Sequence, residues 1–131
     1  MSTINNEDPL LGQFPQSMTR GLLGSALVYL SGPITGKPNE NAEAFQAAED
    51  ALTLVGFRCV NPVTLGRALK EKHVALGWPW RPPTYADYMR KDYAELVKCQ
   101  AILMLRGWQQ SNGAKRELQV ACDIGIPIYF Q

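Results

Sequence analysis

Glu117 is the side chain whose position in the sequence most favours chemistry. It stands four residues after Gly113, near the start of a helix-like segment that follows the apolar run 101–105 and a turn. The free N–H groups and the dipole at a helix N-terminus stabilise a carboxylate in its ionised form. An ionised carboxylate at the end of a buried strand can act as a nucleophile. The same position also suits a helix-terminal charge that has no chemical role.

A second carboxylate, Asp92, lies in a predicted helix over residues 85–98, with Tyr88 one turn earlier on the same face. Asp92 is either a solvated helix carboxylate or a partner for Glu117. Asp87 stands closer to the start of this helix and is a candidate capping residue. The order of residues leaves these interpretations open.

The segment 29–36 has the composition of a strand followed by a ligand-binding loop. It reads Tyr-Leu-Ser-Gly-Pro-Ile-Thr-Gly, and two glycines after a strand allow the backbone to approach a ligand closely. The spacing is neither the dinucleotide fingerprint nor a P-loop, so a simple turn is the alternative. Lys37 is the cation nearest to this loop and either assists an anion or is solvated.

An alternating series of strands and helices must position these residues. Apolar runs predict strands over 26–31, 57–60, 101–105 and 126–130, and helical periodicity predicts helices over 39–55, 64–72, 85–98 and 114–124. This alternation indicates an α/β fold with a parallel sheet and helices on both faces. Ligands bind such sheets outside the carboxyl ends of the strands, where residues 31–37, 61–64 and 106–113 are expected.

Length and composition limit the other possibilities. The 131 residues suit one domain over 25–131, preceded by a tail over 1–24. A net charge of +1 with no basic block argues against a nucleic-acid partner, and no apolar stretch is long enough for a membrane span. One histidine and three scattered cysteines predict no metal site and a reducing compartment, the cytoplasm. We expect no cofactor.

The loop over 73–83 is rich in proline and carries Trp78 and Trp80. It is either a lid whose rings stack on a base or a surface loop that packs its own aromatic side chains. The loop and the tail are also candidate parts of an interface between subunits.

Four motifs, in this order, resemble the nucleoside 2-deoxyribosyltransferase-like superfamily, and within it a small branch of bacterial and phage proteins. They are Tyr29-x-Ser-Gly-Pro-Ile-Thr-Gly36, Asn61-Pro-Val63, Tyr88-Met-Arg-x-Asp92 and Ser111-x-Gly-x-x-x-Glu117-x-x-x-Ala121, and the match covers most of residues 26–130. The resemblance implies a flavodoxin-like three-layer sandwich with a parallel sheet of four or five strands. It also implies a homo-oligomer, because in the family a neighbouring subunit completes the pocket.

The resemblance further implies cleavage or transfer at the N-glycosidic bond of a deoxynucleoside or its 5′-monophosphate. Glu117 would attack the anomeric carbon and form a glycosyl-enzyme, Asp92 would protonate the departing base, and Tyr29 would orient Glu117. Such chemistry needs one ionised and one protonated carboxyl close together, as in a retaining glycosidase. Whether the intermediate passes to water or to a second base stays open.

Substrate contacts are expected in the strand-end loops and on the helix that carries Asp92. The candidate residues are Ser31, Gly32, Pro33, Ile34, Thr35, Gly36, Asn61, Tyr88, Ser111, Asn112 and Gly113. Two other functions use the same pocket. One is a module that binds or sequesters a nucleotide without turnover, and the other is hydrolysis of another N-glycoside, such as a NAD-derived nucleotide.

Overall fold

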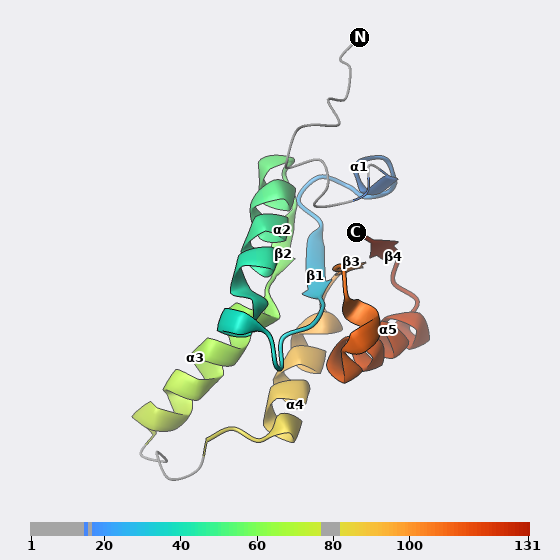
Figure 1. Cartoon of the computed structure of the whole chain (residues 1–131). Helices are drawn as coiled ribbons and strands as arrows, with labels where there is room; N and C mark the ends of the chain where they lie inside the picture. Colours follow the sequence, from blue (N-terminus) through green and yellow to red (C-terminus); the bar gives the residue numbers. More distant parts are fainter. Residues whose placement is uncertain (1–14, 16, 77–81) are drawn as a thin grey trace.

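The computed structural model describes residue 15 and residues 17–76 and 82–131. Its centre is an all-parallel sheet of four strands in the order β2-β1-β3-β4 (Figure 1). The strands are β1 (Leu27–Ser31), β2 (Arg58–Val60), β3 (Ala101–Met104) and β4 (Ile128–Phe130). This α/β arrangement is consistent with a flavodoxin-like three-layer sandwich and confirms the predicted fold class, with four strands among the described residues.

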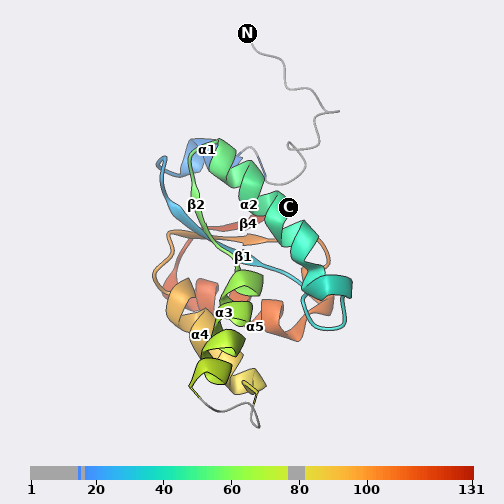
Figure 2. The ribbon, with the colours of Figure 1, turned by 90° about the vertical axis from the view of Figure 1, so that its left-hand side faces the viewer.

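Helices cover both faces of the sheet. They are α1 (Ser17–Gly21), α2 (Ala42–Leu54), α3 (Pro62–Ala75), α4 (Tyr85–Leu96) and α5 (Asn112–Ile124), with 3₁₀ turns η2 (Pro38–Asn41) and η3 (Trp108–Gln110). Figure 2 shows α1 and α2 on one side of the strands and α3, α4 and α5 on the other. None of these described helices is both long and apolar enough to cross a membrane.

The central strand β1 divides the hydrophobic core into two halves. Val28 and Leu30 pack in the cluster under α2, whereas Tyr29 packs in the cluster under α4 and α5. Successive side chains of a strand point to opposite faces, so Ser31 lies on the same face as Tyr29. The neighbouring strands β2 and β3 both pair with β1 in parallel, which places Tyr29 opposite Val60 and Ile102. The hydroxyl groups of Tyr29 and Ser31 are thus held on the face of the sheet that α4 and α5 cover.

Helix α3 is longer than the sequence predicted. The expected helix covered 64–72, but α3 begins at Pro62 and includes His73 in its last turn. The side-chain oxygen of Asn61 accepts a hydrogen bond from the Val63 backbone N–H at 3.0 Å, and proline at the first helical position has a preset φ. The Asn-Pro pair therefore both ends the strand and starts the helix.

The chain before α2 is a left-handed turn, although the sequence predicted helix from residue 39. Asn39, Glu40 and Asn41 have φ values of 50°, 58° and 58°, a conformation that costs about 1 kcal/mol or more for residues other than glycine. Asn41 donates to the Pro33 carbonyl at 2.9 Å. Arg67 on α3 donates to Glu40 at 3.0 Å and to Asn39 at 3.1 Å. These bonds hold the loop after β1 in place.

Part of the predicted tail belongs to the folded domain. Residues 1–24 were expected to form a tail, but Ser17–Gly21 forms α1, and Met18 is fully buried in the cluster under α2. A helix this short has too little periodicity to be recognised in the sequence. The remainder of the tail through residue 14, together with Trp78 and Trp80 of the predicted loop, lies outside the described residues.

Substitution of Met18 tests whether α1 is part of the core. Met18→Ala should lower the free energy of unfolding by about 2 to 5 kcal/mol, because it leaves a cavity where a buried side chain was. Leu23→Ala is the matched control, because Leu23 is 86% exposed and its loss should change stability by less than about 0.5 kcal/mol. Urea unfolding followed by circular dichroism measures both, and equal stabilities of the two variants would contradict the packing of α1.

Candidate active site

Glu117 lies in the second turn of α5 and is only 4% exposed. The helix starts at Asn112 because Ser111 caps it, its hydroxyl accepting a hydrogen bond from the Ala114 N–H at 3.1 Å. The influence of a helix N-terminus fades within the first turn. The expected stabilisation of Glu117 by the helix end is therefore secondary, and other groups must satisfy this buried carboxyl.

Two hydroxyl groups from β1 hold the Glu117 carboxylate. The Tyr29 hydroxyl donates to Oε2 at 2.6 Å, and the Ser31 hydroxyl donates to Oε1 at 2.7 Å. Distances this short are typical of hydrogen bonds from a hydroxyl to a charged oxygen. Both donors are fully buried. Burial and the nearby Glu117 charge raise the pKa of Tyr29 well above its ordinary value, so its hydroxyl keeps the proton that it donates.

Asp92 on α4 forms a pair with Glu117. Burial, the negative charge of Glu117 and a hydrogen bond between the two side chains raise the pKa of Asp92 to about 8. Burial also raises the pKa of Glu117, to about 7, against the lowering effect of hydrogen bonds from Tyr29, Ser31 and Asp92. Because the Tyr29 and Ser31 hydroxyls donate to Glu117 and favour its ionised form, Asp92 is the partner that holds the proton and donates it to the Glu117 carboxylate. The two titrate as a pair.

The start of α4 explains why Asp92, and not Asp87, reaches Glu117. Thr84 and Asp87 form a capping box, in which the Thr84 hydroxyl accepts from the Asp87 N–H at 3.2 Å and Asp87 accepts from the Thr84 N–H at 2.9 Å. Thr84 is thus the N-cap residue, and Asp87 is engaged as the third helical residue of the capping box. Asp92 follows more than one turn later on the face that points into the cleft, together with Tyr88.

Above the carboxyl pair lies an open cleft of about 730 Å³. Besides Asp92 and Glu117, the predicted site residues that line it are Gly32, Pro33, Ile34, Thr35, Gly36, Tyr88, Ser111, Asn112 and Gly113. Tyr29 does not line the cleft but supports Glu117 from the core. Ser31, which was expected to contact substrate, has the same supporting position.

Asn61 is a further correction to the predicted substrate contacts. Its side-chain oxygen caps α3, and its side-chain nitrogen donates to Glu49 Oε1 at 3.1 Å. With both ends of the amide engaged, Asn61 shapes the wall of the cleft, and it is the following residues, Pro62 and Val63, that line it.

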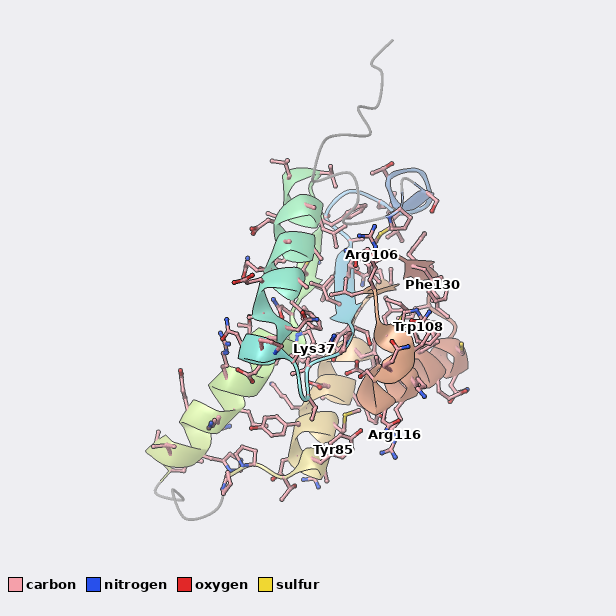
Figure 3. All side chains as sticks on the ribbon, in the orientation of Figure 1. Lys37, Tyr85, Arg106, Trp108, Arg116 and Phe130 are labelled. Carbon is pink, nitrogen blue, oxygen red and sulfur yellow. The ribbon has the colours of Figure 1, made fainter. Side chains whose placement is uncertain are left out.

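Several residues of the cleft were not singled out from the sequence, and three of them meet at its mouth or on its α4 wall. Tyr85 and Met89 on α4, and Arg116 on α5, line it as well. The Arg116 guanidinium carbon lies 5.6 Å from the centre of the Tyr85 ring, a cation–π contact between the two helices (Figure 3). Residues 85, 88, 89 and 92 have the spacing of one helical face. That periodicity predicted the helix, but it did not show that this face lines a cleft.

The cleft contains anionic and cationic groups. Among residues 15, 17–76 and 82–131, no group of three or more His, Cys, Asp or Glu side chains is placed to hold a metal ion. Lys37 and Arg116 are the basic residues of its lining, and Glu40 is paired with Arg67. The arrangement can therefore position a polar organic molecule over one ionised and one protonated carboxyl.

Residues 26–130 match the model of a protein family described as a domain of unknown function (DUF4406). The match includes every strand of the sheet and all of the residues that surround the carboxyl pair. No curated protein matches the chain.

The carboxyl pair predicts an unusual dependence of stability on pH. Because both pKa values are raised, to about 7 and about 8, the native state retains protons that the unfolded chain has released. The free energy of unfolding should fall as pH rises from about 4.5 to about 8. In Glu117→Gln this fall in the free energy of unfolding should be smaller by on the order of 1 kcal/mol or more, since one pKa unit corresponds to about that much.

Urea unfolding at a series of pH values measures this effect. Glu43→Gln is the matched control, since it removes one negative charge from an exposed position on α2. Parallel curves for the wild type and Glu117→Gln would show that Glu117 carries no raised pKa.

Proposed function

The chain belongs to the DUF4406 family of domains of unknown function, and we propose that it is an enzyme that cleaves or transfers the N-glycosidic bond of a deoxynucleoside or deoxynucleotide. The observation that carries this proposal is the hydrogen-bonded pair of Asp92 and Glu117 beneath the cleft. One carboxyl with a retained proton beside one that ionises more readily matches the acid and the nucleophile that such cleavage requires. The motifs that resemble the deoxyribosyltransferase-like superfamily support the same activity.

The pairing favours a retaining mechanism. Retaining glycosidases hold their two carboxyl groups about 5 to 5.5 Å apart, whereas inverting enzymes separate them by about 6.5 to 9.5 Å to admit a water molecule. Carboxyl groups that share a hydrogen bond, as Asp92 and Glu117 do, leave no space for an intervening water. Covalent catalysis by Glu117 is therefore the better fit.

In the proposed reaction, a Glu117 oxygen attacks the anomeric carbon of the sugar while the bond from that carbon to the base nitrogen breaks. Asp92 transfers its proton to the departing base, which replaces Glu117 as the hydrogen-bond acceptor. Tyr29 and Ser31 hold Glu117 in position through the hydroxyls that donate to it. Ionised Asp92 then takes a proton from water or from a second base, whose attack on the glycosyl ester frees Glu117.

The cleft also suits a ligand of this class. Its volume of about 730 Å³ falls within the range of about 300 to 1,000 Å³ that is usual for small-molecule sites. A 2-deoxy sugar reacts more readily than a ribose, because no 2-hydroxyl withdraws electrons from the oxocarbenium-like transition state.

Location and assembly are further parts of the proposal. Cys59, Cys99 and Cys122 are free thiols, which supports a reducing compartment such as the cytoplasm.

The proposal that the protein forms a homo-oligomer rests on the family resemblance and on the exposure of Tyr85 and Arg116 at the mouth of the cleft. Light scattering of the purified protein measures its mass, and a strict monomer would contradict an assembled pocket.

Substitution of Glu117 tests the enzymatic function. The wild-type protein, incubated with a panel of deoxynucleosides and their 5′-monophosphates, should release free base detectable by chromatography. Glu117→Ala should reduce this rate by about 1,000-fold or more, since the nucleophile is lost, whereas Glu43→Ala should retain it. A new nucleoside formed after addition of a second base identifies a transferase.

The enzymatic proposal fails if no substrate of the panel releases base. A nucleotide that raises the melting temperature and is recovered intact would then identify a binding module without turnover.

The pH dependence of the rate tests whether Glu117 acts as the nucleophile and Asp92 as the general acid. The value of kcat/KM should follow a bell, because the active form holds one proton on the carboxyl pair: the rate rises as the pair loses its first proton and falls as it loses the second, with both raised pKa values near 7 to 8. Asp92→Asn should lower the rate by about 10² to 10⁴-fold and abolish the alkaline limb. The loss should be smaller for a substrate whose leaving group departs without a proton. An equal loss for both substrates would rule out Asp92 as the general acid.

A further inference from the structure

The turn over residues 39–41 is a stretch of strained backbone next to the cleft. Asn39, Glu40 and Asn41 all have positive φ, and Ser25 is the one other described residue besides glycine that does. This region is unfavourable for residues with a side chain, because Cβ comes too close to the following carbonyl oxygen. Such a conformation persists where surrounding contacts impose it, often at ligand sites. The contacts of this turn are therefore of functional interest.

Arg67 on α3 supplies the contacts that reach the turn from another element. Its Nε donates to Glu40 Oε1 at 3.0 Å, and its Nη2 donates to Asn39 Oδ1 at 3.1 Å. One guanidinium can serve both acceptors because its donors form a planar fork. The bond from Asn41 to the Pro33 carbonyl, by contrast, lies within the loop itself. Arg67 thus ties the left-handed turn to α3.

The turn continues directly from the segment that forms one wall of the cleft. Residues 32–37 and Glu40 line the cleft, whereas Arg67 does not. Helix α3 adds three residues to the same lining, Pro62, Val63 and Gly66. Arg67 therefore connects two parts of the cleft wall from behind, without a place in the lining.

The exposure of the ion pair between Arg67 and Glu40 separates a local role from a contribution to global stability. The two side chains are 46% and 53% exposed, and pairs this exposed contribute little to the free energy of unfolding. The same contacts still determine how often the turn opens, because local openings do not require the rest of the fold to unfold. Loss of Arg67 should therefore disturb the cleft wall more than it lowers global stability.

We propose that Arg67 is a positioning residue for the reaction: it keeps the turn 39–41 left-handed and so holds residues 32–37 and Glu40 in the shape that binds the ligand. Without Arg67 the turn relaxes, and the wall has the binding shape for only a fraction of the time. The apparent affinity falls by that fraction. The carboxyl pair is held from the sheet, so its chemistry is unchanged once the ligand is bound. This inference rests on the proposed N-glycosidic activity and adds a residue that controls binding.

Steady-state kinetics of Arg67→Ala test this role on the deoxynucleoside or deoxynucleotide that the wild type cleaves. KM should rise by roughly tenfold, as expected for a wall that is competent about a tenth of the time, whereas kcat should change by less than about twofold. Lys70→Ala is the matched control, because it removes the same charge from an exposed position one turn later on α3. Both constants should then stay as in the wild type. An unchanged KM in Arg67→Ala, or a fall in kcat alone, would overturn the role.

A double substitution separates positioning from a direct effect of the Arg67 charge on the ligand. Glycine enters the left-handed region without strain, and the flanking asparagines tolerate this region better than most residues. In a Glu40→Gly background the turn should no longer depend on Arg67, so the further substitution Arg67→Ala should leave KM nearly unchanged. A charge effect would instead raise KM again in this background, and that result would overturn the positioning role.

Hydrogen exchange tests the turn without any need for turnover. The Lys37 N–H donates to the Ile34 carbonyl, and the Glu40 N–H donates to the Lys37 carbonyl. Peptides that cover residues 32–41 should exchange these protons roughly tenfold faster in Arg67→Ala, because the turn opens more often. Peptides from β3 and α5 should exchange as in the wild type.

The exchange experiment also keeps this inference separate from the enzymatic proposal. If the wild type releases no base, the enzymatic proposal fails, and the exchange comparison alone decides whether Arg67 holds the turn. Equal exchange over residues 32–41 in the wild type and Arg67→Ala would overturn the positioning role, even in a protein that cleaves its substrate.

Discussion

The burial of the Glu117 carboxyl is the constraint on which the rest of the site depends. An ionised carboxylate without partners is very costly in a protein interior. Here its charge is offset by the hydroxyls of Tyr29 and Ser31 and by the proton of Asp92. These donors come from β1 and α4, while Glu117 comes from α5. Three elements must therefore be aligned for one side chain to be satisfied.

Short-range signals align these elements. Ser111 determines where α5 begins, and so which of its residues face the sheet. The capping box of Thr84 and Asp87 does the same for α4. In β1, the pairing register presents Tyr29 and Ser31 to the same face, and a slip by one residue would turn both hydroxyls toward α2. The geometry of the site is therefore only as well defined as the helix caps and the strand register that position its side chains.

Under the proposed function, the residues that would react and the residues that would select the ligand are held in different ways. Tyr29, Ser31 and Glu117 are buried and held by the sheet and α5, so their geometry is fixed by the core. The walls above them are built differently: a left-handed turn pinned by Arg67, a glycine in α3 and an exposed cation–π pair between α4 and α5. Changes in these walls would alter which ligand fits without disturbing the carboxyl pair. The walls of the cleft and the buried residues around Glu117 therefore depend on different parts of the structure.

The elements that depend on local patterns could be predicted from the order of residues alone. Apolar runs and helical periodicity predicted the parallel α/β sheet, and the strand ends predicted where Glu117 and the loop after β1 would meet. The same patterns missed α1, which is too short to show a period, and the left-handed turn at Asn39, whose conformation depends on Arg67 from a distant helix.

The roles of the side chains depend on how the elements pack together. Asp92 became the partner of Glu117 because α4 and α5 pack on the same face of the sheet, a relation that no local pattern encodes. Ser31 became a support for Glu117, and Asn61 became a cap. The physical reason is range: propensities and caps act over a few residues, whereas burial and hydrogen bonding between elements arise only after the chain has packed. The raised pKa values of the carboxyl pair are products of that packing.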